Sequence, residues 1–208
     1  MARLSPAGPP VPDIFLSTES TLSSLPLVLL FALLALAVWH DVRARRIPNA
    51  VVFPGALLAL ALHALLPAGA GLFGTPMGSL GLLSALGGLA LGLAILLPMY
   101  VLRLMGAGDV KLLAMVGAFV GASGIVTVAI ATLLAGGVLA LAVAAWQRSL
   151  RRLLNNTYQT MLHAGLTGLA DGIAAPAVAS GRLPYAVAIA TGTVASVLWL
   201  RAYGELPL

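Results

Sequence analysis

Residues 47–102 read IPNAVVFPGALLALALHALLPAGAGLFGTPMGSLGLLSALGGLALGLAILLPMYVL, a run of 56 residues without Asp, Glu, Lys or Arg. A membrane-spanning helix needs about 20 predominantly apolar residues, so this run is long enough for two spans and a connection. Glycine and proline gather at 67–76, where they favour a turn. The run therefore predicts two consecutive transmembrane helices joined by that turn.

The composition of the whole chain indicates the same class of protein. Hydrophobic residues make up 61% and charged residues 8% of the 208 residues, and the mean hydropathy is +1.06. Soluble domains are roughly 25% charged, so we expect one integral membrane domain without a sizeable soluble enzyme. The basic residues form short clusters between apolar runs, which fits membrane topology better than nucleic-acid binding. The absence of cysteine excludes disulfides, thiol nucleophiles and zinc–thiolate sites.

Outward from 47–102, further apolar runs predict further helices. Residues 20–40 predict a first helix, preceded by a flexible N-terminal tail at 1–20. The 36 uncharged residues at 112–147 predict a fourth and a fifth helix, the fourth short or tilted. The sequence Gly-Ala-Ser-Gly at 121–124 predicts the break between these two helices.

The C-terminal part completes a predicted all-α, polytopic bundle of about six transmembrane helices. Residues 183–200 predict the sixth helix. The connection at 148–182 repeats apolar residues at helical spacing and predicts an interfacial amphipathic helix, with a half-buried segment or a cytoplasmic loop as the alternatives. Residues 21–208 would then form a single membrane-embedded domain.

The lysines and arginines are distributed unequally between the two sides of this six-helix arrangement. Two lie on one side, Arg3 and Arg201, and nine lie on the other: Arg43, Arg45, Arg46, Arg103, Lys111, Arg148, Arg151, Arg152 and Arg182. Because cytoplasmic loops are enriched in positive charge, we expect the nine-charge side to be cytoplasmic and both termini to face outward. Asp41 and Asp109 then share the cytoplasmic side.

Asp41 and Asp109 are candidates for chemistry because a charge in a bilayer costs about 3 kcal/mol or more. Either acid could simply end a helix at the water interface. Two carboxylates at one depth can also share a proton, so that one accepts a proton from water while the other hydrogen-bonds a substrate carbonyl, as in aspartic proteases. The same pair could bind a cation or relay protons in a transporter.

The neighbours of the two acids have candidate roles of their own. Gly106 and Gly108 carry no Cβ and would let an extended substrate backbone approach the site, or would simply break a helix. Lys111 and the arginines are interpreted as topology determinants and headgroup contacts. Asn49 could hydrogen-bond near the first acid or help to start a helix. His40 points about 100° away from the acid that follows it and has no histidine partner at ligand spacing, so we expect no metal site.

Two segments carry a resemblance to a known family. Residues 41–49 (DVRARRIPN) and 106–114 (GAGDVKLLA) resemble the two signature segments of type IV prepilin peptidases. Their order, the helix pair between them and the charge asymmetry agree with that family. Residues 183–186 (LPYA) look like a further, weaker family feature. The resemblance covers most of 25–200, apart from the connection at 148–182.

This resemblance implies an intramembrane aspartyl endopeptidase of the GxGD type, with Asp41 and Asp109 as the catalytic pair and without a cofactor. Members of the family remove the short basic leader of type IV prepilins or pseudopilins at the cytoplasmic face of the bacterial inner membrane. The implied partners are therefore a prepilin or pseudopilin substrate and the lipid bilayer, without nucleic acid.

Two further expectations concern the type of activity. Many bacterial members carry an insert with two CxxC pairs, which is associated with N-methylation of the cleaved pilin. This chain has no cysteine, so we expect peptidase activity without N-methyltransferase activity, as in the small peptidases of tight-adherence pilus systems. The alternative function is a small ion or metabolite transporter that uses the Asp pair. Such a transporter should carry further polar groups along its spans, and the second, third and fifth predicted helices are nearly bare of them.

Overall fold

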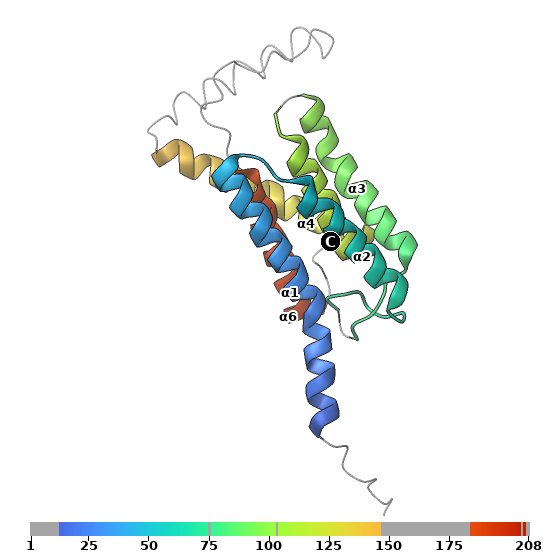
Figure 1. The fold of residues 1–208 in the computed structure, drawn as a ribbon. Coiled ribbons are helices and arrows are strands. Elements are labelled where there is room, and N and C mark those ends of the chain that lie inside the picture. Colours follow the sequence, from blue (N-terminus) through green and yellow to red (C-terminus); the bar gives the residue numbers. More distant parts are fainter. Residues whose placement is uncertain (1–12, 75, 103, 147–183, 205, 207–208) are drawn as a thin grey trace, which may run out of the picture.

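The computed structural model of the protein describes residues 13–74, 76–102, 104–146, 184–204 and 206. The regular structure in these ranges is helical, apart from one isolated bridge between Ala68 and Ser79. Figure 1 shows the helices in the order α1 (Asp13–Ala44), α2 (Asn49–Leu65), α3 (Leu82–Val101), α4 (Ala107–Trp146) and α6 (Tyr185–Tyr203). The predicted all-α class is therefore confirmed.

Several of these helices are suited to cross a membrane. Four contain stretches that are long and apolar enough to do so: Ser24–Ala44, Leu82–Val101, Ala107–Val143 and Tyr185–Tyr203. The fifth helix, α2, is apolar but has only 17 residues. Large apolar side chains such as Leu83 and Val101 are exposed, as expected of helices that face lipid. The protein is thus an integral membrane protein, while six spans and outward-facing termini remain predictions; residues 148–182 lie outside the described residues.

The prediction of two helices within 47–102 is confirmed by α2 and α3. The connection between them folds back on itself: the N–H of Ser79 donates to the carbonyl of Pro67 at 2.7 Å, and that of Gly69 donates to the carbonyl of Ser79 at 3.0 Å. A Cβ added to Gly69 would lie 2.7 Å from the Cα of Gly78. The two backbone segments of the connection can therefore approach this closely only because residue 69 has no side chain. These bonds satisfy backbone groups that belong to no helix.

The fourth helical element, α4, changes direction within the break predicted at 121–124. The backbone of Gly121 leaves the helical region, with φ 77° and ψ 176°, a conformation that is essentially restricted to glycine. Before Gly121 the helix runs beside α3. Beyond it the chain, yellow in Figure 1, turns toward α6. The predicted division of this apolar run into two helical segments is therefore found at Gly121.

The backbone groups on either side of this break are bound by side chains of α2 and α3. The N–H of Leu80 donates to Nδ1 of His63 at 3.2 Å. Nδ1 is therefore the acceptor, and Nε2 carries the proton and donates it to the carbonyl of Phe119 at 3.3 Å. The N–H of Ala122 donates to Oγ of Ser84 at 3.4 Å. Since an unpaired backbone group in a membrane interior is costly, these contacts stabilise the break.

The ends of the first and last described helices can be compared with the ends that the apolar runs predict. The last helix, α6, corresponds to the helix predicted at 183–200. The first, α1, begins at Asp13 rather than at residue 20, so that 13–20 of the predicted flexible tail are helical. Neither glycine nor proline occurs in the first turns of α1, and the helix of the apolar span can therefore continue toward the N-terminus. Residues 1–12 lie outside the described residues.

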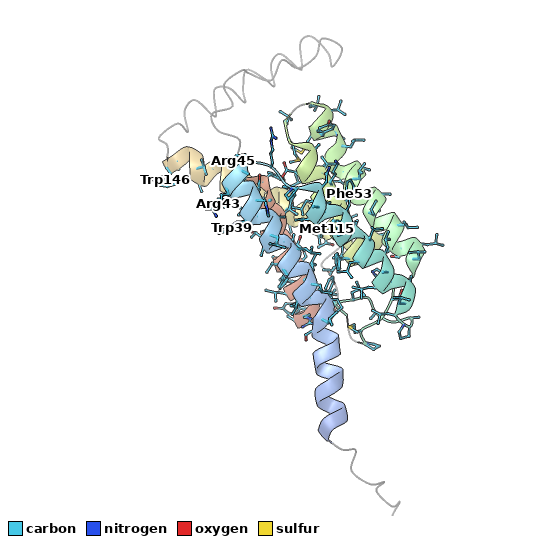
Figure 2. All side chains as sticks on the ribbon, viewed as in Figure 1. Trp39, Arg43, Arg45, Phe53, Met115 and Trp146 are labelled. Atoms are coloured by element: carbon cyan, nitrogen blue, oxygen red, sulfur yellow. The ribbon has the colours of Figure 1, made fainter. Side chains whose placement is uncertain are left out.

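The centre of the bundle is α4, which packs against each of the other four helices. Its first part is buried on every side: the fully buried residues include Leu112, Leu113, Met115, Val116 and Phe119. A helix that is apolar all round belongs in the interior of a bundle. Because this buried segment, in which Met115 is labelled in Figure 2, directly follows Asp109, its packing determines where that acid lies.

Candidate active site

The two predicted acids lie at the same end of the bundle. Asp41 is in the last turns of α1, and Asp109 is in the first turn of α4. Ile47, six residues after Asp41, lies against Gly108, the residue before Asp109, although 68 positions separate the two acids in the sequence. Asp41 is buried, with 7% of its surface exposed, and Asp109 is partly exposed. The structure therefore brings together the acids of the two signature segments.

Asp41 is also bound by the first turn of α6. The N–H of Ala186 donates to Oδ2 of Asp41 at 3.1 Å. The first N–H groups of a helix have no partner within the helix, and a helix N-terminus favours a negative charge on its acceptor. Residues 183–186 stood out in the sequence, but no sequence pattern indicates this contact, because the donor is a backbone group 145 positions away.

Asp109 is held by its own helix end. The N–H of Gly106 donates to Oδ2 of Asp109 at 3.2 Å, and the N–H of Asp109 donates to the carbonyl of Gly106 at 3.2 Å. An acid that reaches back to the residue before its helix is half of a capping box. Asp109 thus stands at a helix end, as one of the two interpretations from the sequence held. Its hydrogen bonds with Gly106 orient the carboxylate and are compatible with a chemical role.

The turn after α1 packs against the second glycine of the GxGD segment. Arg45 has a positive φ of 52°, and its N–H donates to the carbonyl of Asp41 at 2.8 Å. A left-handed residue commonly closes a helix, at a cost of about 1 kcal/mol for a residue other than glycine. A Cβ added to Gly108 would lie 3.1 Å from the Cβ of Ile47. Gly108 therefore leaves room for Ile47, whereas Gly106 is exposed.

Lys111 joins the start of α2 to the start of α4. Its Nζ donates to Oδ1 of Asn49 at 3.2 Å and lies 5.3 Å from the centre of the Phe53 ring. The residue at the N-cap of α2 is Pro48, and no side-chain cap bond is made there. Asn49 is the first residue of α2, so the predicted helix start at this position is confirmed, while its side chain accepts from Lys111 and not from a backbone N–H of the helix end.

The arginines that follow Asp41 lie on the surface at the end of α1. Arg43, Arg45 and Arg46 are exposed, and the guanidinium of Arg43 lies 5.0 Å from the centre of the Trp39 ring (Figure 2). Tryptophan and arginine near the end of an apolar helix are typical of the membrane–water boundary. These contacts support the interpretation of the arginines as boundary residues beside the site.

The polar groups at this site are carboxylates and hydrogen-bond donors. The described ranges contain no group of three or more His, Cys, Asp or Glu side chains that could hold a metal ion. Nδ1 of His40 bonds to the carbonyl of Leu36 on its own helix at 2.8 Å. Paired carboxylates can supply both a proton acceptor and a proton donor, which general acid–base attack on a carbonyl requires.

Two carboxylates on different helices, at the same end of an apolar bundle, are compatible with the paired acids of an aspartic peptidase. Comparison with protein families matches residues 28–141 to the type IV leader peptidase family, and the chain belongs to this family of aspartic prepilin peptidases. The matched residues include both acids, whereas α6 lies beyond them. No curated protein and no solved structure matches the chain.

Proposed function

We propose that the protein removes the leader peptide of type IV prepilins or pseudopilins at the cytoplasmic face of the membrane, with Asp41 and Asp109 as the catalytic pair. The observation that carries the proposal is the convergence of these two acids from α1 and α4. Family membership supports the reaction type and the substrate class. The cytoplasmic location follows from the arginines around Asp41, since positive charge marks cytoplasmic loops.

The two acids divide the work of hydrolysis between them. One carboxylate removes a proton from water, and the water oxygen then attacks the scissile carbonyl carbon. The other acid gives its proton to the carbonyl oxygen, which yields a neutral tetrahedral diol. The C–N bond breaks as the amine takes a proton from the first acid and the diol returns one to the second. Both acids then recover their starting states.

The contacts of the acids suggest which one has which part. Asp41 accepts the N–H of Ala186 at the positive end of α6, and such a position favours a negatively charged acceptor. We therefore assign Asp41 as the base that activates water and Asp109 as the proton donor. Gly106, which is exposed beside Asp109, is the position where an extended substrate backbone can approach without a side chain in the way.

We further propose that this chain acts as a peptidase without N-methyltransferase activity, because the cysteine pairs associated with methylation are absent from its sequence. The N-terminus of the processed pilin should then be unmethylated when the chain is the only added enzyme. Mass spectrometry of the product measures this directly, and a mass increase of one methyl group would contradict it.

The catalytic assignment is tested with Asp41→Asn and Asp109→Asn in membranes that contain a prepilin. Each substitution keeps the size of the side chain and removes its ability to exchange a proton, so we expect both variants to insert normally and to lose cleavage. Asp13→Asn makes the same change at the other end of α1 and should cleave like the wild type. Wild-type cleavage by either active-site variant would refute the assignment.

A further inference from the structure

The short connection between α1 and α2, residues 45–48, contacts the beginning of α4. It starts one helical turn after Asp41, and within it Ile47 lies against Gly108 of the GxGD segment. Arg45 opens the connection with a positive φ of 52°. A residue other than glycine keeps such a conformation only where the surrounding structure holds it there. Contacts with the rest of the bundle must therefore hold the connection in place.

Lys111 supplies a second contact between the same two parts of the chain. Its Nζ donates at 3.2 Å to Oδ1 of Asn49, the residue that follows the connection, and lies 5.3 Å from the centre of the Phe53 ring, one turn further along α2. The ammonium group thus binds α2 through a charge-assisted hydrogen bond and a cation–π contact. Because Lys111 follows Asp109 by two residues on the buried first part of α4, whatever this lysine holds is held relative to that acid.

We propose that Lys111 is a positioning residue of the peptidase. By holding Asn49, it keeps the connection at 45–48 on α4, and it thereby sets the distance between the two acids. The inference rests on the proposed function, in which Asp41 and Asp109 act on the same scissile bond. Since misplacement of a reacting group by about 1 Å can cost a hundredfold in rate, a contact that sets this distance should be measurable in kcat.

The direct test is Lys111→Met, which keeps most of the unbranched side chain and removes the ammonium group. We expect kcat per folded molecule for prepilin cleavage to fall about fivefold, with KM within about twofold, because less accurately placed acids react more slowly. Asn49→Ala removes the acceptor and should have the same effect, whereas Lys111→Arg can still donate to Asn49 and should keep most of kcat. The control is Arg43→Met, which removes a positive charge that packs on Trp39 of its own helix and should keep both constants.

A double variant separates positioning from a role in topology or headgroup contact. If Lys111 acts through Asn49, Lys111→Met combined with Asn49→Ala should lower kcat about fivefold, like each single change, rather than the about 25-fold of independent effects. A lysine that only sets topology or contacts headgroups would leave Asn49→Ala at wild-type kcat. That outcome, independent effects in the double variant, or wild-type kcat in Lys111→Met would overturn the inference.

Disulfide formation tests the same contact without cleavage. When Ile47→Cys and Gly108→Cys are present together, addition of Lys111→Met should slow their oxidation severalfold, because the connection spends less time on α4. An unchanged oxidation rate would contradict the proposed role. If the asparagine variants of the acids are inactive while Lys111→Met has wild-type kcat, only the role of Lys111 fails. If those asparagine variants cleave normally, the proposed function fails, and the oxidation rate still decides whether Lys111 holds the connection.

Discussion

Gly192→Ala is expected to separate α6 from α4 and to impair the site two turns away. A Cβ at Gly192 would lie 2.5 Å from the backbone N and 2.7 Å from the Cα of Thr132. Ordinary contact begins at 3.4 Å, so α6 must withdraw by about 0.9 Å at this point. Backbone atoms cannot rotate aside as a flexible side chain can. The strain must therefore be relieved by movement of the whole helix.

The cost of this movement can be estimated. Overpacking of a tight contact costs about 1–3 kcal/mol, and alanine gains about 1 kcal/mol over glycine within a helix. A net loss of about 1 kcal/mol lowers Tm by about 2–4 °C for a chain of this size. The first turn of α6 lies about 10 Å along the helix from Gly192. Because misplacement by about 1 Å can cost a hundredfold in rate, we expect kcat to fall by about tenfold or more.

The assay compares Gly192→Ala with Gly137→Ala in the same detergent or membrane. Both variants gain the helix preference of alanine, but an added Cβ at Gly137 meets no atom within 4 Å. We expect Gly137→Ala to keep or raise Tm and to keep its cleavage rate. If the two variants have the same Tm and the same kcat, α6 does not depend on close contact with Thr132, and the reasoning is refuted.

Two further predictions concern the packing around the site. His63→Ala removes the partners of the Leu80 N–H and the Phe119 carbonyl, so thermal unfolding should show a loss of about 2 kcal/mol or more with kcat per folded molecule retained; an unchanged Tm would contradict the proposed support of the α4 break. Ile47→Cys combined with Gly108→Cys places two Cβ atoms 3.1 Å apart in a chain that has no other cysteine. A shift of about 0.4 Å brings them into the range of a disulfide, so mild oxidation should form one. Two free thiols that persist under oxidation, counted by mass spectrometry after alkylation, would show that the turn after α1 does not dock on α4.

Much of the helical framework could be predicted because it follows from local sequence. The uncharged run at 47–102 has room for α2 and α3, and its glycines and prolines lie where the connection is found. The glycines at 121–124 likewise indicated the break in α4. The first residue of α1 could not be predicted from the apolar run, because a helix continues past the end of such a run until a residue interrupts it.

The partners of individual side chains could not be predicted in the same way. No local sequence pattern indicates a partner for His63, yet it binds the Phe119 carbonyl, which a kink in another helix leaves available. Asn49 had two local readings, and its observed partner is Lys111, 62 positions away. Such contacts depend on how helices pack, and several residues of similar chemistry could satisfy each of them.

Some features of the active site follow from the sequence, and others follow only from the packing of the helices. Apolar runs and basic clusters suffice to predict a membrane-embedded bundle with Asp41 and Asp109 on one side, because each is a property of residue type and order. The aspartic peptidase was implied by the resemblance of the segments around these two acids to the signature segments of the family. The contacts of Ala186 with Asp41 and of the Tyr185 ring with Gly136 arise only when α6 packs against both α1 and α4. Almost every residue carries a backbone N–H. The partner of a given N–H therefore depends on where folding places it rather than on its residue type.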